Sequence, residues 1–250
     1  MSIPADTDLT RDAFLGGRLH LWQPRQGYRA GIDAVLLAAS VPAQPGQRVL
    51  ELGCGVGVAV LCLGARVGDL TLTGVERDPT FAALAQRNGE EALEVVTADL
   101  ADLPPHLRAR QFDHVLANPP YFDRNASIAS ADPAREAAHG AQTPLEDWVK
   151  VAAKRLAPKG QAHFIHRTEA LPRIIRALPS GMGSIEVLPI AARAGRDPDR
   201  MILRARKNGR GAFRMHAPLI MHEGPHHLHD GDSFVPEVTA ILRDGAPLSF

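Results

Sequence analysis

The chain has 250 residues, with 28 lysines and arginines against 28 aspartates and glutamates. This length suits one large α/β domain whose core needs no covalent staples. Because the formal net charge is zero, overall charge is excluded as the basis for binding a polyanion, and any such contact must come from a local cluster.

The sequence carries no sign of export or of a membrane-spanning segment. Residues 1–6 lack the basic start of a signal peptide, and no apolar stretch reaches the ~18 residues that a membrane helix needs. Cys54 and Cys62 show no metal-ligand spacing, so we expect reduced thiols. The prediction is a soluble, cytoplasmic protein with no membrane partner.

Strands and helices are expected to alternate after a polar entry segment. Residues 10–30 are polar with glycine turns, and the apolar run 31–39 predicts a helix that ends before Pro42. Further strands are predicted at 49–52, 70–75, 93–97, 112–117, 161–165 and 185–190, and helices at 58–67, 79–88, 144–156 and 169–178. This alternation predicts an α/β fold with a Rossmann-like, doubly wound, mostly parallel sheet.

The last third of the chain has a different pattern. Strands are predicted at 201–206 and 212–220, a turn at 230–233 and a short helix at 236–242. Because no helix separates these late strands, we expect them to form an antiparallel pair on the edge of the sheet.

A glycine-rich turn lies between the strand 49–52 and the helix that follows. In the run from Glu51 to Gly57, the residues Gly53 and Gly55 let a ligand approach the backbone closely. A dinucleotide-binding turn would place a third glycine at the sixth position, which is Val58 here. The turn therefore favours a neutral or cationic ligand such as S-adenosylmethionine.

Acidic residues end the next two strands. Glu76 follows the first glycine by 23 residues, a separation at which a carboxylate can accept both hydrogen bonds of a ribose diol. Asp99 can accept from an adenine amino group, although it could also simply cap a helix. Ligand groups at three successive strand ends favour a cofactor site.

The tetrapeptide Asn118-Pro119-Pro120-Tyr121 follows the strand 112–117. The Asn118 carboxamide and the Pro119 carbonyl can together accept both N–H bonds of one NH2 group, and the prolines hold those acceptors rigid. Tyr121 can stack on a ring that carries the amine. This pattern predicts a site for a planar amine, and by itself it suits adenine, cytosine or glutamine equally.

Taken together, these motifs make the chain similar to a known enzyme family. It resembles the class I S-adenosylmethionine-dependent methyltransferases, and among them the bacterial tRNA1(Val) (adenine-N6)-methyltransferase family. The resemblance rests on Leu15-Gly16-Gly17-Arg18, the run from Gln23 to Leu37, the Glu51 to Gly57 turn, Asn118 to Tyr121, and the ending His222-Glu223 with Pro236-Glu237-Val238.

The resemblance implies roles for particular residues. Tyr28, Arg29 and Asp33 would border the methionine end of the cofactor. The remaining cofactor-binding residues would be Glu51, Gly53, Gly55, Glu76, Asp99 and Asn118. The resemblance also implies a cofactor-covering segment at 1–45 and a class I methyltransferase domain at 46–250.

The reaction implied is methylation of the exocyclic N6 of an adenine in tRNA near the anticodon. Catalysis at Asn118, Pro119, Pro120 and Tyr121 would be mainly orientation and electrostatics. A basic stretch, with eight basic residues from Arg193 to Arg214 against Asp197 and Asp199, is a candidate for phosphate contact or an ordinary solvated edge.

Other functions also fit parts of the sequence. Release-factor methyltransferases use the same tetrapeptide on a protein glutamine, but they carry a helical domain before the cofactor turn. An RNA-binding module without catalysis would leave the cofactor turn unexplained, and Val58 disfavours a dehydrogenase.

The histidine cluster His222, His226, His227 and His229 invites a zinc interpretation. No cysteine or carboxylate completes a regular ligand set. We therefore expect a histidine-rich turn and no metal.

Overall fold

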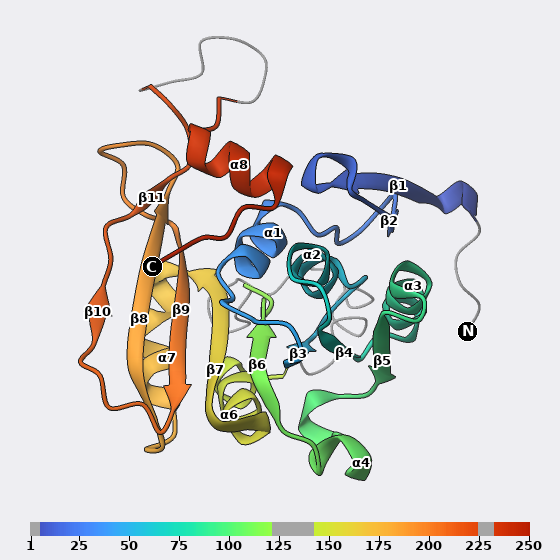
Figure 1. The fold of residues 1–250 in the computed structure, drawn as a ribbon, viewed down its shortest axis with the longest axis horizontal. Coiled ribbons are helices and arrows are strands. Elements are labelled where there is room, and N and C mark those ends of the chain that lie inside the picture. The colour runs from blue at the N-terminus through green and yellow to red at the C-terminus, as the bar shows by residue number, and fades with distance from the viewer. Residues whose placement is uncertain (1–5, 122–142, 225–232) are drawn as a thin grey trace, which may run out of the picture.

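The computed structural model describes residues 6–121, 143–224 and 233–250. A mixed sheet runs through the molecule in the order β10-β8-β9-β7-β6-β3-β4-β5, and β11 also pairs with β8 (Figure 1). Its strands are β3 (Arg48–Leu52), β4 (Thr71–Glu76), β5 (Leu93–Thr97), β6 (Phe112–Ala117), β7 (Leu156–Arg167), β8 (Met182–Ala191), β9 (Arg200–Lys207), β10 (Arg214–Met215) and β11 (Leu219–Ile220).

Helices cover both faces of this sheet, which confirms the doubly wound α/β prediction. The described helices are α1 (Ile32–Ala39), α2 (Val58–Arg66), α3 (Pro79–Gly89), α4 (Pro105–Arg108), α6 (Leu145–Arg155), α7 (Leu171–Ala177) and α8 (Pro236–Asp244). Short 3-10 turns are η1 (Asp6–Asp8), η2 (Leu15–Gly17), η3 (Leu100–Asp102) and η4 (Thr168–Ala170). No described helix has the length and apolarity to cross a bilayer.

Two apolar cores lie on the two faces of the sheet. One contains side chains of α1, α2, α3 and α8, and the other those of α4, α6 and α7. In β3, Val49 belongs to the first core and Leu50 to the second, as the alternation of a strand requires. Strands that are buried on both faces read as continuous apolar runs, which is why β3 and β6 were recognisable in the sequence.

Local signals fix several of the boundaries. Asp78 caps α3, with its Oδ1 accepting from the Thr80 and Phe81 amides at 2.7 and 3.2 Å, and Pro79 occupies the first helical position. Both are preferred choices at a helix start.

The antiparallel part of the sheet differs in detail from the prediction. β9 lies between β7 and β8 and is antiparallel to both, whereas β10 and β11 run parallel to β8. The prediction of one antiparallel strand at 212–220 is therefore wrong. Pro218 lacks an N–H and restricts the residue before it, so the ladder is interrupted between the two short strands. Of the turn predicted at 230–233, residues 230–232 lie outside the described residues.

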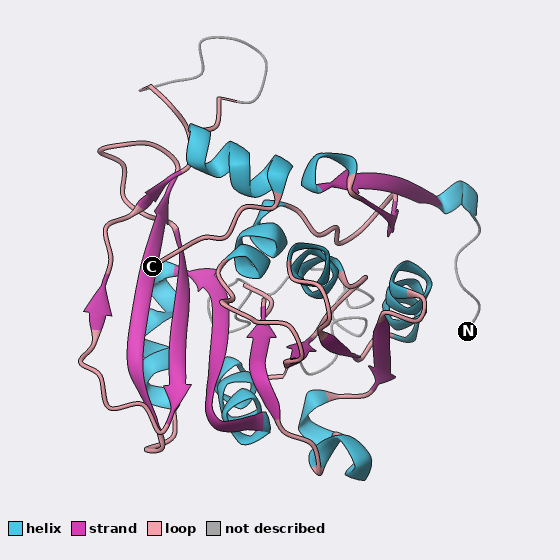
Figure 2. Ribbon diagram, viewed as in Figure 1, coloured by secondary structure: helices cyan, strands magenta, loops and turns pink. Residues whose placement is uncertain are grey.

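The polar segment 10–30 contains a hairpin that the sequence pattern did not reveal. β1 (Leu9–Phe14) pairs antiparallel with β2 (Leu19–Pro24), apart from the main sheet (Figure 2). Its turn includes Gly16 with φ of 65°, and a Cβ there would lie 2.5 Å from the Arg243 carbonyl oxygen of α8. Glycine at this position therefore lets the hairpin pack against the C-terminal helix.

Candidate active site

The carboxyl ends of the parallel strands bring the predicted motifs together. In the sheet register, Leu52 of β3 is opposite Val75 of β4 and Ala117 of β6. The glycine turn and the tetrapeptide therefore leave the sheet side by side, with Glu76 beside them on β4. Open α/β sheets bind their ligands outside this edge.

A hollow of about 290 Å³, a volume that includes open solvent at its mouth, lies at this edge. Five of the residues predicted from the sequence line it, namely Tyr28, Glu51, Gly53, Gly55 and Asn118. The glycine turn forms its floor, since Cys54, Val56, Val58 and Ala59 also face it.

The glycine turn has a conformation that side chains would obstruct. Gly53, Gly55 and Gly57 have φ of 63°, 55° and 88°. A Cβ on Gly53 would lie 2.4 Å from the Trp148 ring of α6, whereas one on Gly55 would meet nothing nearer than Tyr28 at 3.9 Å. Gly53 is thus required by packing, and Gly55 keeps the backbone open toward the hollow.

Glu51 is a buried carboxyl at the base of the hollow. Its Oε2 accepts from the Val60 amide in the first turn of α2 at 2.9 Å. Burial raises the pKa of Glu51 to about 8, the Val60 hydrogen bond lowers it, and the charge of Glu76 raises it. With this raised pKa the Glu51 carboxyl is largely protonated at neutral pH, and a cation in the hollow would favour its ionised form.

Glu76 and Asp99 are both engaged with backbone amides. Glu76 Oε2 accepts from Gly55 N at 2.9 Å, and its Oε1 accepts from Asp78 N at 2.8 Å. Asp99 Oδ1 accepts from Ala101 N at 2.8 Å and caps η3. Glu76 is held beside the glycine turn, while for Asp99 the structure shows the capping role.

Asp33 and Arg29 do not line the hollow. Tyr121 donates its hydroxyl proton to Asp33 Oδ2 at 2.7 Å, and Arg200 of β9 is hydrogen-bonded to Asp33 Oδ1. Arg29 forms an ion pair with Asp12 of the hairpin at 2.5 Å. Asp33 therefore fixes Tyr121, and Arg29 ties the chain before α1 to the hairpin.

Within the tetrapeptide, Asn118 is half-buried, Pro119 is buried and Pro120 is exposed. Burial, followed by the nearby charge of Asp33, raises the pKa of the Tyr121 hydroxyl, so this group is a neutral donor. Tyr121 also packs against His166 of β7, with ring centroids 4.9 Å apart.

Sequence reasoning missed His166 and Trp148 in this region, and it named Arg200 only as part of the basic stretch. Arg200 pairs with Arg167 in the β7–β9 register, so the first residue of an antiparallel strand reaches the carboxyl edge of the parallel ones. The sequence pattern predicted the strand β9, but it could not show where this strand lies in the sheet.

The basic stretch does not form one free face. Arg193 is buried and donates to the Gly224 carbonyl at 3.0 Å, Arg204 pairs with Glu186 at 2.5 Å, and Lys207 donates to the Leu156 carbonyl at 2.7 Å. Arg206 is opposite Gln161, which is six residues before the end of β7. Arg206 therefore lies toward the amino ends of the parallel strands, away from the hollow. Arg196, in the loop between β8 and β9, is exposed at the site edge.

The histidine cluster is only partly described. His222 stacks on Phe234 with centroids 4.7 Å apart, whereas His226, His227 and His229 lie outside the described residues. Among the described residues, no group of three or more His, Cys, Asp or Glu side chains is arranged to hold a metal ion.

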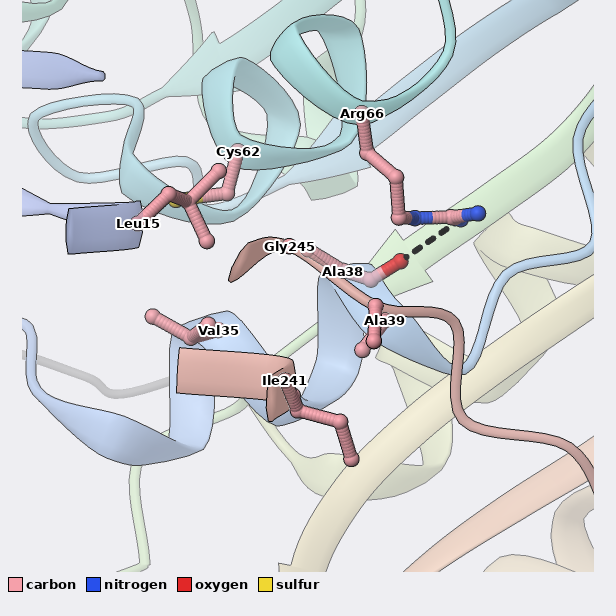
Figure 3. Close-up of a pocket in the computed structure, with 9 residues that line it drawn as sticks. Leu15, Val35, Ala38, Ala39, Cys62, Arg66, Ile241 and Gly245 are labelled. Atoms are coloured by element: carbon pink, nitrogen blue, oxygen red, sulfur yellow. Dashed lines mark hydrogen bonds between the residues drawn. The ribbon is translucent and has the colours of Figure 1, made fainter. Parts of the chain in front are cut away.

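A second hollow, of about 170 Å³, lies between α1, α2 and α8. Figure 3 shows Leu15, Val35 and Ile241 among the residues that line it, and Arg66 donating to the Ala38 carbonyl, a bond of 3.1 Å. Apart from Arg66 its walls are apolar, and burial raises the pKa of its Cys62 thiol to about 12. This hollow is a packing gap between helices and offers no reactive group.

Comparisons with known proteins agree with this geometry. The methyltransferase small domain family matches residues 29–188. A protein of Shewanella halifaxensis named tRNA1(Val) (adenine(37)-N6)-methyltransferase is 30% identical over 190 residues, covering 74% of this chain and 76% of its own. A protein of the same name from Haemophilus influenzae strain PittGG is 26% identical and covers 93% of this chain and 97% of its own.

A similar solved structure is a predicted O-methyltransferase, Atu636 from Agrobacterium tumefaciens. It is 29% identical, has a TM-score of 0.72, and covers 87% of this chain and 99% of its own. The Thermus thermophilus 16S rRNA N2 G1207 methyltransferase, solved with AdoMet and guanosine, has a TM-score of 0.55 at 23% identity over 80% of this chain and 50% of its own, and supports the fold alone.

Replacing Glu51 with glutamine should alter the pH dependence of stability. The protonated Glu51 carboxyl contributes stability that is fully present below its ordinary pKa of 4.5 and is lost as pH rises through about 8. Glutamine can still accept from Val60 but never ionises. We expect Glu51→Gln to unfold at a higher temperature than the wild type at pH 9 and at a similar temperature at pH 5, measured by calorimetry without ligand. Equal pH slopes would contradict the assignment.

Gly53→Ala should be destabilising because both its positive φ and the Trp148 ring oppose a Cβ. We expect a loss of about 1–3 kcal/mol in unfolding free energy, as for an overpacked core site. Gly68→Ala is the matched control, since a Cβ there meets nothing within 4 Å. Denaturant unfolding of both variants measures the effect, and equal stabilities would show that the turn can relax.

Proposed function

The chain belongs to the methyltransferase small domain family and is an S-adenosylmethionine-dependent methyltransferase, and we propose that it methylates the exocyclic N6 of an adenine in tRNA near the anticodon. The observation that carries the proposal is the position of Asn118. Asn118 lines the same hollow as Glu51 and the glycine turn, so an amine held by its carboxamide would lie beside the cofactor.

The residues present fit this cofactor. The turn at Gly53 and Gly55 leaves its backbone open, and Glu76 has carboxylate lone pairs beyond its two backbone bonds for a ribose diol. Asp99 would accept a hydrogen bond from the adenine amino group. Tyr28 would cover the methionine end of the cofactor, together with the rest of the cofactor-covering segment 1–45. The bound cofactor supplies an electrophilic methyl group on a sulfonium.

Asp33 and Arg29 would act indirectly in this arrangement. Asp33 holds the Tyr121 hydroxyl, and Arg29 anchors the hairpin through Asp12. Both residues would therefore support the cofactor site indirectly, by positioning other groups.

The proposed chemistry needs orientation more than a strong base. The exocyclic nitrogen is a poor nucleophile because its lone pair delocalises into the ring. Bonds from its two hydrogens to Asn118 Oδ1 and the Pro119 carbonyl favour a pyramidal nitrogen with its lone pair available. The nitrogen held in this way would accept the methyl group that the cofactor supplies, and its surplus proton would leave afterwards. Tyr121 would stack on the base, a contact worth about 1–3 kcal/mol.

Two observations support tRNA as the substrate. The relatives at 26–32% identity are named for adenine 37 of tRNA1(Val). The exposed Arg167 ends β7 and the exposed Arg196 lies in the loop between β8 and β9, both at the carboxyl ends of the parallel strands, where they could contact phosphates of a bound RNA.

Asn118→Ala should lose transfer with cofactor binding largely retained. We expect methyl incorporation into unmodified tRNA to fall by at least about 100-fold, the scale of losing one catalytic hydrogen-bonding group. Transfer of tritiated methyl measures turnover, and calorimetry with S-adenosylmethionine measures binding.

The same labelled assay separates the acceptors. Incorporation into a release factor instead of tRNA would replace the adenine proposal by glutamine methylation. Full activity of Asn118→Ala on tRNA would refute the proposed amine grip.

A further inference from the structure

His166 is a buried residue near the end of β7 that has no role in the function proposed above. It is 5% exposed and lies one residue before Arg167, the last residue of the strand. β7 is next to β6 in the sheet, with Ala117 opposite Phe164. The end of β7 therefore runs beside the tetrapeptide that leaves β6.

The hydrogen bonds of His166 define its tautomer. Its Nδ1 accepts from the Arg167 amide at 2.9 Å. In a neutral imidazole the other nitrogen, Nε2, then carries the proton and is the donor. The ring also faces the backbone of Pro120, and because proline has no N–H, the Pro120 carbonyl is the acceptor available to Nε2.

The same ring also supports Tyr121. The Tyr121 and His166 rings are 4.9 Å apart and inclined by 58°, and the far end of Tyr121 is fixed by Asp33. His166 therefore contacts two consecutive residues of the tetrapeptide, Pro120 through its polar edge and Tyr121 by packing.

This contact reaches the atoms that would grip the amine. The Pro119 carbonyl and the Pro120 ring nitrogen share one planar peptide unit, so restraining Pro120 also restrains the direction of the Pro119 carbonyl. A displaced acceptor costs heavily in a reaction that depends on orientation.

We propose that His166 is a positioning residue that sets the Pro119 carbonyl and the Tyr121 ring for the bound amine. This inference rests on the proposed function. It assigns to His166 neither contact with the substrate nor proton transfer.

A pH dependence follows from the tautomer. Protonation would place a hydrogen on Nδ1, directly against the Arg167 N–H. Burial lowers the pKa of His166, with the charge of Arg167 also opposing protonation, while the Pro120 carbonyl and Glu169 favour it. Tyr121, which faces the ring, is a neutral donor to Asp33, and Arg200 balances the Asp33 charge. The support is present above this lowered pKa and is lost as pH falls through it.

The test uses two substitutions with opposite expectations. His166→Phe keeps an aromatic ring but loses both ring nitrogens, and we expect kcat on tRNA to fall about 10- to 100-fold, the scale of a misplaced reacting group. The KM for S-adenosylmethionine should change less than about twofold because the cofactor turn is untouched. His166→Gln retains a donor near the position of Nε2 and should restore most of kcat at pH 8.

The pH profile separates positioning from simple stability. The wild type should lose kcat on the acid side, and the loss should be smaller in His166→Gln, which has no titrating ring. His106→Phe and His106→Gln on the exposed helix α4 are matched controls and should leave the profile unchanged. Wild-type kcat in His166→Phe, or no rescue by glutamine, would overturn the proposal.

An activity-independent measurement distinguishes this inference from the proposed function. In nitrogen-15 histidine spectra, His166 should remain the Nε2–H tautomer and titrate below the ordinary value of ~6.5. If the wild type methylates no tRNA while His166 behaves in this way, the proposed function fails and the structural support stands. A freely exchanging ring that titrates at its ordinary value would overturn the inference, even if His166→Phe does not fold.

Discussion

The parallel alignment of β3 with β4 and β6 is the constraint on which the rest of the site depends. Because the three strands are parallel, their carboxyl ends lie side by side. Gly53, Glu76 and Asn118 therefore become neighbours although they are far apart in the chain. The apolar cores on both faces make a one-residue slip costly, because each strand would exchange its buried side chains between the two cores. The site geometry thus follows from how the sheet is packed.

A second set of contacts closes the site from outside the parallel strands. The Asp33 carboxylate joins α1, the tetrapeptide and β9 through Tyr121 and Arg200. Arg200 can take part only because β9 is inserted antiparallel between β7 and β8. The Asp33 charge is partly shielded from solvent and is matched by a guanidinium, so the pair orients Tyr121 without leaving an unpaired buried charge.

Much of the fold and part of the site could be predicted from the sequence. Local periodicity identified the alternating elements, and strand-end chemistry identified Glu51, Gly53, Gly55 and Asn118, which all line one hollow. The hairpin β1–β2 was missed because polar residues such as Arg11 and Asp12 occupy much of its surface. The role of Asp33 toward Arg200 was also inaccessible, since strand order is a long-range property that no local pattern encodes. The basic stretch appeared as one surface because its residues are close in sequence. In the structure its strand β9 runs from the carboxyl ends of the parallel strands to their amino ends.

The central claim is that the amine gripped beside Asn118 is the N6 of a tRNA adenine. Mass spectrometry of nucleosides from purified tRNA, compared between a strain with the gene and one lacking it, tests this claim most directly. The account predicts that N6-methyladenosine disappears from one tRNA when the gene is removed and returns with the wild-type gene but not with Asn118→Ala. An unchanged set of methylated nucleosides in the strain lacking the gene would contradict it.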